Sequence, residues 1–365
     1  MRLPGLAIKD FQLANCIFQG GMGVGISLHP LAGAVAREGG LGIVSSAGLR
    51  TIVSVRDTEK VDTYTAVRRE LERALDASCG LPVGINVMCA VVGDYEPTIR
   101  ASIDAGISAI VSGAGLPLSL PGIQPPGHTA LIPIISSARA FELIIKRWEK
   151  LHYRPDAVVL EGPMAGGHLG FKMHEVDDPA FSLENILPSV LEVAHRYGDI
   201  PVIVAGGIYT HEDIVRFLAM GASGVQMATR FLATNESTAT DAYKQAVLSA
   251  GIDDITVVSH PVSGPASPCG LPFRVLTNSP IFSVNRPPKC DKGYVLQRGP
   301  DGKLTECQAT PQAANPKAFL CICNGLLSSA GYAPDEPPLY TVGSNAYRVK
   351  EILSVATLMA ELRGE

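Results

Sequence analysis

Hydrophobic residues in this chain form short continuous runs, separated by longer stretches in which apolar positions recur every three to four residues. Short uninterrupted runs are typical of strands buried on both faces, and the longer periodic stretches are typical of amphipathic helices. Their alternation predicts repeated strand–helix units around a parallel sheet. Eight such units predict a closed (β/α)₈ barrel, the TIM-barrel fold. The predicted strands are Ala14–Gln19, Leu41–Ser45, Pro82–Met88, Ile107–Ser112, Ala130–Ile135, Ala157–Glu161, Pro201–Ala205 and Gly224–Met227.

The stretches between the runs carry start and stop signals of helices. Pro30 opens an apolar stripe that ends at Gly39 and Gly40, as expected for proline in a first helical turn and glycine after the last. Thr210 and Asp213 have the spacing of a capping box at the start of another helix. These signals support the assignment of the longer stretches to helices.

The regular alternation ends near residue 258. Nearly half of the 27 prolines fall between Pro261 and Pro338, where periodic apolar stretches are few. A long irregular segment inside a compact domain is commonly a lid, a binding segment or an oligomer contact, so a homo-oligomer is one expectation. Amphipathic spacing returns at Val349–Leu362, which predicts a helix that docks on the barrel. The predicted organisation is a barrel at residues 1–257, an irregular lid or interface segment at 258–348 and a C-terminal helix at 349–365.

Composition and charge limit the classes of function. A chain of 365 residues with 46% hydrophobic and 18% charged residues is long enough to bury a large core. The net charge of −5 without long basic or acidic runs predicts no nucleic-acid partner and no anionic membrane partner. The chain has no leader pattern and no apolar run near the roughly 20 residues of a spanning helix, so we expect a soluble cytoplasmic protein.

Eight cysteines in a chain of this length are too few for a disulfide scaffold, so reduced thiols are expected. Five of them lie in the irregular segment, but no pair there has the two-residue spacing of a zinc or iron–sulfur motif. We therefore predict no metal, with a metal or cluster as the alternative. The five are Cys269, Cys290, Cys307, Cys321 and Cys323.

Candidate chemistry begins directly after the sixth predicted strand, where residues 161–170 read Glu-Gly-Pro-Met-Ala-Gly-Gly-His-Leu-Gly. Active sites of parallel α/β barrels lie at the carboxyl ends of strands, and glycines let the backbone approach a flat ligand closely. His168 is therefore the first candidate for proton transfer, and His174 is a weaker one. The alternative for either residue is a surface-loop histidine with no catalytic role.

Glycine-rich segments also follow the seventh predicted strand and contain the eighth, at Ala205–Ile208 and Gly221–Arg230. In barrels of this kind the loops after strands seven and eight commonly bind phosphate, because backbone N–H groups and a helix N-terminus favour an anion. A flavin or a sugar phosphate fits this position. The alternative is that these glycines serve only as turns.

Three other strand ends offer partners for a flavin ring. An isoalloxazine has donors and acceptors along one edge and apolar faces elsewhere. Backbone amides near Gly21 and Met22, the Asn86 amide and the Gln19 carboxamide could satisfy that edge, with Met22 packed on a face. Asn86 could equally be a turn residue at a strand end. Residues 113–117, Gly-Ala-Gly-Leu-Pro, follow the fourth strand at the same edge.

Taken together, these motifs resemble the flavin-dependent nitronate monooxygenases, formerly called 2-nitropropane dioxygenases, and the related flavin-dependent enoyl-acyl carrier protein reductases. The resemblance covers about residues 10–235 and includes six motifs in order: Phe18–Gly23, Gly39–Gly42, Gly113–Gly115, Glu161–Gly170, Ala205–Ile208 and Gly224–Phe231. It implies a TIM barrel, FMN as the cofactor, His168 as the catalytic histidine, and the phosphate at Gly206, Gly207 and residues 227–229. The FMN-binding set predicted from the strand ends and the resemblance is Gln19, Gly20, Gly21, Met22, Asn86, Gly113, Glu161, Ala165, Gly166, Gly167, Ala205, Gly206, Gly207, Gln226, Met227, Ala228 and Thr229.

The chain departs from the family's pattern at Pro163 and Met164, where glutamate is common, and at two positions that bear on the branch. Members that oxidise nitronates typically have proline before the methionine of the first motif and glutamine at the start of the histidine motif. This chain has Gly21 and Glu161 instead. Both departures favour the enoyl reductase branch, so the substrate is less firmly implied than the cofactor.

The resemblance predicts FMN-dependent oxidation of alkyl nitronates, small-molecule substrates, by O₂. The alternative is an NAD(P)H-dependent flavin reductase of enoyl thioesters or quinones, in which His168 donates a proton or a hydrogen bond. A third hypothesis, from another class, is a flavin-binding sensor or assembly protein whose tail contacts a partner. Flavin that stays oxidised with nitronate and with NAD(P)H would favour the third hypothesis.

Overall fold

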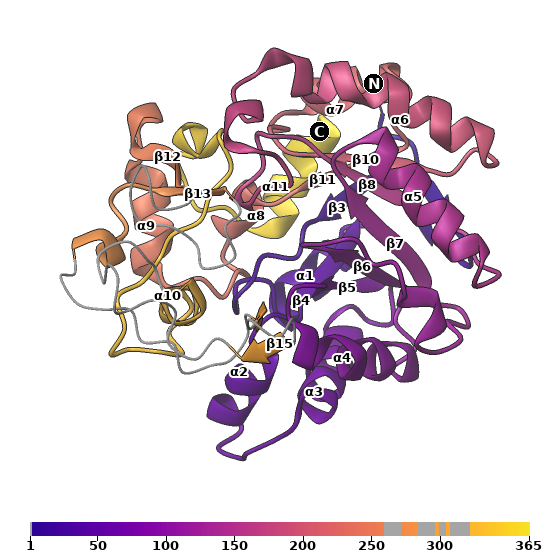
Figure 1. The fold of residues 1–365 in the computed structure, drawn as a ribbon. Coiled ribbons are helices and arrows are strands. Elements are labelled where there is room, and N and C mark those ends of the chain that lie inside the picture. The colour runs from indigo at the N-terminus through magenta and orange to yellow at the C-terminus, as the bar shows by residue number, and fades with distance from the viewer. Residues whose placement is uncertain (1, 259–271, 284–295, 299–303, 307–321) are drawn as a thin grey trace.

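Eight parallel strands close into a barrel, which confirms the predicted TIM-barrel fold. The computed structural model describes residues 2–258, 272–283, 296–298, 304–306 and 322–365. Around the barrel the strands follow one another in chain order, and the last pairs with the first (Figure 1). They are β3 (Ile17–Gln19), β4 (Leu41–Ser45), β5 (Val83–Met88), β6 (Ala109–Gly113), β7 (Ala130–Ile135), β8 (Val158–Glu161), β10 (Val202–Ala205) and β11 (Gly224–Met227).

The first barrel strand begins at Ile17, three residues later than its apolar run predicts. The Asn15 side chain accepts a hydrogen bond from the Ile17 amide and donates one to the Glu38 carbonyl, at 3.2 Å and 2.9 Å. These bonds occupy backbone groups that a longer strand would pair, so the side chain of Asn15 delays the start of the strand.

Helices form the outer ring, and the predicted capping box is present at Thr210 and Asp213. Short 3₁₀ turns lie at Leu120–Gly122, Met173–Glu175, Pro179–Phe181, Ile252–Asp254, Pro280–Ser283 and Ala346–Arg348. The helices of the described chain are α1 (His29–Arg37), α2 (Leu49–Arg56), α3 (Thr63–Ala77), α4 (Val92–Asp104), α5 (Ala138–Glu149), α6 (Leu183–Arg196), α7 (His211–Ala219), α8 (Thr229–Leu232), α9 (Asp241–Ser249), α10 (Ile322–Ser329) and α11 (Val355–Arg363).

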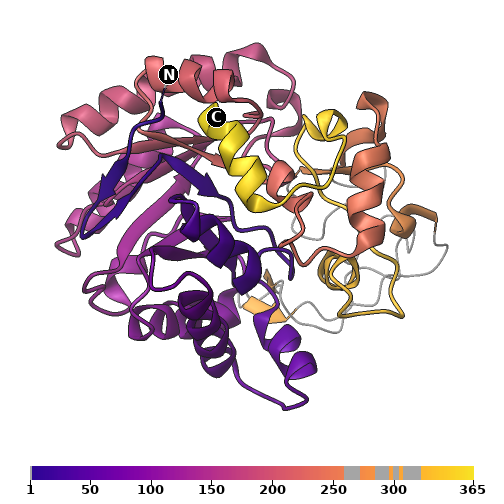
Figure 2. The same ribbon diagram turned by 180° about the vertical axis from the view of Figure 1, so that it is seen from behind.

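The C-terminal helix completes this ring. α11 packs against α1, α7 and α8, so it takes the place of the helix that would directly follow β11 (Figure 2). It begins at Val355, later than the predicted Val349, because Ser354 caps it by accepting a hydrogen bond from the Thr357 amide at 3.0 Å. The residues between α8 and α11 are therefore an insertion in the last strand–helix unit of the barrel.

We call the described residues of this insertion, 233–354, the post-barrel unit; in Figure 1 its elements gather at one side of the barrel. It has its own small core, in which the rings of Tyr243 and Tyr340 stack with centroids 4.5 Å apart. β12 (Ile255–Val258) pairs with β13 (Phe273–Leu276), so the boundary predicted at residue 257 cuts through a sheet. β13 also pairs with β9 (Gly167–His168), and β14 (Leu296–Arg298) pairs with β15 (Leu304–Glu306).

A short N-terminal hairpin, which hydrophobic spacing did not predict, consists of β1 (Leu6–Ile8) and β2 (Phe11–Leu13). At its turn, Lys9 donates a hydrogen bond to the Thr129 carbonyl, just before β7 begins. The hairpin therefore lies at the amino ends of the barrel strands, and the carboxyl ends remain available for a site.

Candidate active site

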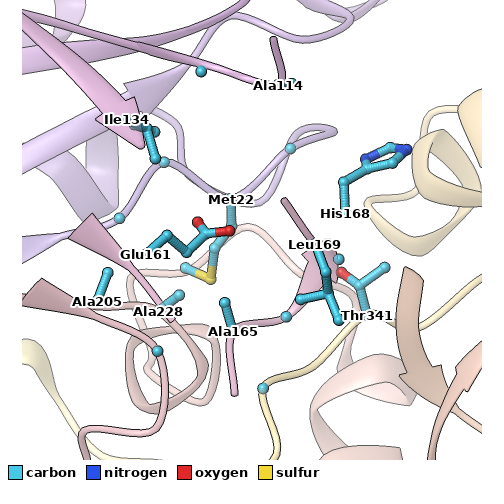
Figure 3. Close-up of a pocket in the computed structure, with 18 of the residues that line it drawn as sticks. Met22, Ala114, Ile134, Glu161, Ala165, His168, Leu169, Ala205, Ala228 and Thr341 are labelled. Atoms are coloured by element: carbon cyan, nitrogen blue, oxygen red, sulfur yellow. The ribbon is translucent and has the colours of Figure 1, made fainter. Parts of the chain in front are cut away.

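A cavity of about 790 Å³ lies at the carboxyl ends of the barrel strands (Figure 3). The barrel loops and the post-barrel unit both contribute to its walls. The structure brings His168 and all but one of the predicted cofactor-binding residues to this cavity: Gly20, Gly21, Met22, Asn86, Gly113, Glu161, Ala165, Gly166, Gly167, Ala205, Gly206, Gly207, Gln226, Met227, Ala228 and Thr229.

The exception is Gln19, which is fully buried and does not line the cavity. Its carboxamide donates to the Ser27 hydroxyl at 2.8 Å and to the Gly20 carbonyl, and it accepts from the Ile43 amide at 3.1 Å. Its donors and acceptor are thus used within the protein. The expected contact of Gln19 with a ring edge is replaced by a structural role: the side chain holds the loop after β3 against β4.

The floor of the cavity is bare backbone. A Cβ at Gly21 would lie 2.4 Å from Asn86 Cβ, and a Cβ at Gly20 would lie 3.2 Å from Gln226 Cγ. Gly21 has no room for a side chain, and at Gly20 a side chain would require Gln226 to shift. Both glycines line the cavity, so a flat ligand can approach the main chain there. Glycine at position 21, a departure from the family's pattern, is required by its contact with Asn86.

One polar atom at this floor lacks a partner. Gln226 Oε1 is buried and accepts no hydrogen bond from any residue that the structure describes. A buried amide oxygen without a donor costs about 1 to 3 kcal/mol, so a ligand N–H at this place would relieve an existing penalty. This observation fits a ring with an N–H on its polar edge.

The loop after β10 has the geometry of a phosphate cradle. Gly206 and Gly207 follow β10 with φ of +96° and +82°. A Cβ at Gly206 would lie 2.9 Å from the Gly162 carbonyl oxygen, and one at Gly207 would lie 2.8 Å from Met164 Sδ. Only glycine fits both the backbone conformation and the space, which leaves the main chain of this loop exposed to an anion.

A segment of the post-barrel unit, residues 343–345, joins the loops at the cradle; we call it the strap. The Gly343 amide donates to Thr229 Oγ1 at 2.9 Å, and the Ser344 amide donates to the Met164 carbonyl at 3.1 Å. Asn345 Nδ2 donates to the Gly207 carbonyl at 2.6 Å. Sequence reasoning missed this role, although the Gly-Ser-Asn triplet before a turn was a local signal of an ordered loop.

Positive charge lies beside the cradle. The Tyr209 ring, which lines the cavity, has the Arg348 guanidinium 4.2 Å and the Arg230 guanidinium 4.8 Å from its centroid. Arg230 is also paired with Glu361 at 2.5 Å. The two guanidinium groups favour an anion at the cradle, and sequence reasoning had assigned neither of them to the site.

Glu161 ends β8 and lines the cavity (Figure 3). Burial raises the pKa of its carboxyl to about 7, because the charged form is poorly solvated there. Its side chain forms no hydrogen bond or ion pair with another described residue. The carboxyl is therefore available for proton transfer near neutral pH, and it disfavours an anionic ligand once it is ionised.

His168 lies half-buried in the cavity wall, on β9. Its ring meets the Phe273 ring edge to face, with centroids 4.6 Å apart and planes at 66°. His174, the weaker candidate, is exposed and does not line the cavity. The geometry therefore favours His168 of the two histidines for chemistry in this cavity.

Arg274, which sequence reasoning also missed, supports the loop that carries the histidine. Its guanidinium is buried, and Nη1 donates to the carbonyls of Pro163 and Ala165, at 2.6 Å each. Burial lowers the pKa of the Arg274 guanidinium below its usual range. Both hydrogen bonds use N–H groups of this guanidinium as donors. No sequence signal joined Arg274 to residues 163–165, because the contact spans more than 100 positions.

The alternative of a metal or cluster concerned five cysteines of the irregular segment. Four of them lie outside the described residues: Cys269, Cys290, Cys307 and Cys321. Cys323 lines the cavity. Within the described ranges, no group of three His, Cys, Asp or Glu side chains is arranged to hold a metal ion. Among the same residues, no helix is long and apolar enough to cross a membrane.

A sequence profile described as nitronate monooxygenase matches residues 6–365. The chain is 32% identical over 275 residues to a (3aS,4S,5R,7aS)-5-hydroxy-7a-methyl-1-oxo-octahydro-1H-indene-4-carboxyl-CoA dehydrogenase of Rhodococcus jostii. That match covers 73% of this chain and 64% of the relative, slightly less than two thirds of its length. A probable nitronate monooxygenase of Bacillus subtilis is 26% identical, with 68% of this chain and 74% of the relative covered.

Among solved structures, the chain is similar to nitroalkane oxidase from Streptomyces ansochromogenes. The TM-score is 0.66 at 22% sequence identity, with 97% of this chain and 96% of the other covered. At this identity the likeness shows the fold alone.

Proposed function

The chain belongs to the nitronate monooxygenase family, whose members are flavoproteins, and we propose that it is an FMN-dependent enzyme that oxidises alkyl nitronates with O₂. The observation that supports this function best is the position of His168. A half-buried imidazole lies in the same cavity as a bare glycine floor and a glycine cradle. An acid–base group is thus placed beside a surface suited to a flat, phosphate-bearing cofactor.

The residues present fit FMN. Gln226 Oε1 offers an acceptor to a ring N–H, Gly20 and Gly21 leave room for the ring, and Gly206 and Gly207 present main chain to the phosphate. When bound, FMN would supply the transfer of electrons from substrate to O₂. The protein's part is to orient the substrate, exclude water and manage one proton.

In this proposal an imidazole nitrogen of His168 carries out the proton step. In its neutral form it accepts the proton from the acidic carbon of a nitroalkane, and in its protonated form it holds the resulting anionic nitronate. The Phe273 ring packs edge to face against this imidazole. Glu161 opposes an anionic substrate above about pH 7, so nitronate oxidation should be favoured below that pH.

A second candidate is an NAD(P)H-dependent reductase of enoyl thioesters or quinones, and Glu161 favours it. A carboxylate in the cavity does not repel an uncharged thioester as it repels a nitronate. The relative from Rhodococcus jostii is named as a dehydrogenase of a carboxyl-CoA compound, which contains a thioester. In this reading His168 donates a proton or a hydrogen bond to the carbonyl oxygen.

The deciding experiment measures flavin absorbance of the purified protein without oxygen after mixing separately with NADH, NADPH and a small alkyl nitronate. Bleaching by the nitronate alone is the expected result. Rapid bleaching by NADH or NADPH would favour the reductase function over the oxidation of nitronates. Enoyl thioesters and quinones would then be the electron acceptors to test. Flavin that stays oxidised in every mixture would support the binding-protein hypothesis.

A further inference from the structure

The backbone that carries His168 is held by a strand outside the barrel. β9 runs antiparallel to β13, with His168 directly opposite Phe273. One residue on, the Leu169 amide donates to the Pro272 carbonyl at 2.9 Å. His168 lies in the segment that follows the barrel strand β8, and the pairing with β13 fixes its backbone as part of a sheet.

The same strand also contacts the reactive side chain. Phe273 is buried to 1% exposure, and its ring lies edge to face on the His168 imidazole. His168 has no side-chain hydrogen bond to another residue that the structure describes. Among the described residues, the aromatic contact is the specific side-chain interaction available to orient the imidazole.

The next residue of β13 fixes the segment before the histidine. Arg274 is 6% exposed, and its two hydrogen bonds to the Pro163 and Ala165 carbonyls cross from the post-barrel unit to the loop after β8. Hydrogen bonds from a charged donor are about twice as strong as neutral ones. Side chains alternate along a strand, so adjacent residues Phe273 and Arg274 hold two different parts of one loop.

We propose that Phe273 and Arg274 are positioning residues for His168: Phe273 orients the imidazole and Arg274 fixes the loop that carries it. The inference depends on the proposed function only in taking His168 as the reactive side chain. Its physical basis is that a misplacement of about 1 Å in a reacting group can lower a rate about a hundredfold. These two residues of the post-barrel unit then act on the candidate catalytic residue from outside the barrel.

The test compares four variants of the full-length protein. Phe273→Leu removes the ring but keeps an apolar side chain, and Arg274→Met removes the donors but keeps an apolar stem. Arg274→Lys restores a charged donor. Leu276→Val is the matched control, because Leu276 is fully buried on the same strand but belongs to the core that contains Tyr243.

The first readout needs no substrate. Ring protons of His168, assigned in the histidine NMR spectrum by their loss in His168→Gln, should be displaced by the ring current of Phe273 in the unaltered protein. Phe273→Leu should abolish this displacement, and Leu276→Val should preserve it. Equal shifts in Phe273→Leu and the unaltered protein would overturn the assignment of Phe273.

The second readout is the split between kcat and KM. We expect Phe273→Leu and Arg274→Met to lower kcat about tenfold or more with little change in KM, and Arg274→Lys to recover part of the loss. A rise in KM alone, or no recovery with lysine, would overturn the positioning role. If the unaltered protein oxidised no nitronate, the proposed function would fail, while the NMR comparison would still decide the role of Phe273, and the same comparison on Arg274→Met, in which the His168 shifts should change, would decide the role of Arg274.

Discussion

The barrel wall and the post-barrel wall of the cavity differ in what they offer a ligand. The barrel contributes strand ends with exposed main chain, at Gly20, Gly21 and Gly206. The post-barrel unit contributes side chains and hydrogen-bond donors that act on the barrel's own loops, such as Phe273 and Asn345. In our proposal the barrel therefore provides the place for a cofactor, while the inserted unit sets the orientation of the groups around it.

The largest effect is expected for His168, which lies where a barrel loop pairs with a post-barrel strand. His168→Gln removes the proton acceptor and should lower kcat about 10²- to 10⁴-fold, as is usual for loss of acid–base catalysis, while flavin stays bound. Steady-state oxidation of a neutral nitroalkane, whose carbon proton must be removed on the enzyme, and the flavin-to-protein absorbance ratio measure the two quantities. The exposed His174 provides the control, since His174→Gln should keep its rate. A normal rate in His168→Gln would remove the proposed mechanism.

The barrel wall should be intolerant of any side chain at its floor. Gly21→Ala places a methyl group 2.4 Å from Asn86 Cβ, and the resulting shift should destabilise the protein by about 1 to 3 kcal/mol and lower its flavin content. Denaturant unfolding and flavin absorbance report both effects. Gly93→Ala is the matched control, because a Cβ there meets no atom within 4 Å. Equal flavin content in the two variants would show that the floor is not the ring site.

The strap tests the contribution of the post-barrel wall to cofactor binding. Asn345→Ala removes the hydrogen bond to the Gly207 carbonyl, which is worth about 1 kcal/mol, so flavin should dissociate roughly five- to tenfold more readily. Fluorescence of released FMN measures the dissociation constant. Asn185→Ala loses a similar bond, to the Pro179 carbonyl, on an exposed surface that does not line the cavity. Unchanged affinity in Asn345→Ala would limit the strap to a structural role.

The smallest effect is expected for the ionisation of Glu161, which ends β8. The pKa of Glu161 is about 7 in the folded protein, above its usual value of 4.5. Between these pH values the folded state binds more protons than the unfolded chain, so the free energy of unfolding decreases as the pH rises from about 4.5 to about 7. Glu161→Gln should therefore melt at a higher temperature than the unaltered protein at pH 8, and the difference should disappear near pH 5.

The same substitution should alter substrate preference. With an anionic nitronate, kcat/KM of the unaltered protein should fall a few-fold as the pH rises through about 7, and Glu161→Gln should show a smaller fall. An uncharged substrate measured in parallel separates repulsion from a general loss of activity. Identical pH profiles in the two proteins would show that Glu161 does not govern substrate charge.

The local sequence pattern was sufficient to predict the barrel and most of the barrel residues that line the cavity. All eight strands were predicted, because strands buried on both faces leave uninterrupted apolar runs. Residues such as His168, Gly206 and Thr229 were placed together because parallel strands bring their carboxyl ends to one edge. Gln19 was predicted to line the cavity, but its carboxamide bonds to Ser27 and Ile43 instead. Its position at a strand end does not determine which neighbours the carboxamide bonds.

Periodicity and short motifs are local properties, so the fold, the family and the strand-end residues of the candidate site could be predicted from the sequence. Three long-range features could be seen only in the folded chain: α11 packs against α1 and α7, β13 pairs with the strand carrying His168, and Asn345 bonds to the Gly207 carbonyl. These contacts join positions more than 100 residues apart. Their partners are selected by how the chain packs, and no local pattern of hydrophobic or polar residues records that choice.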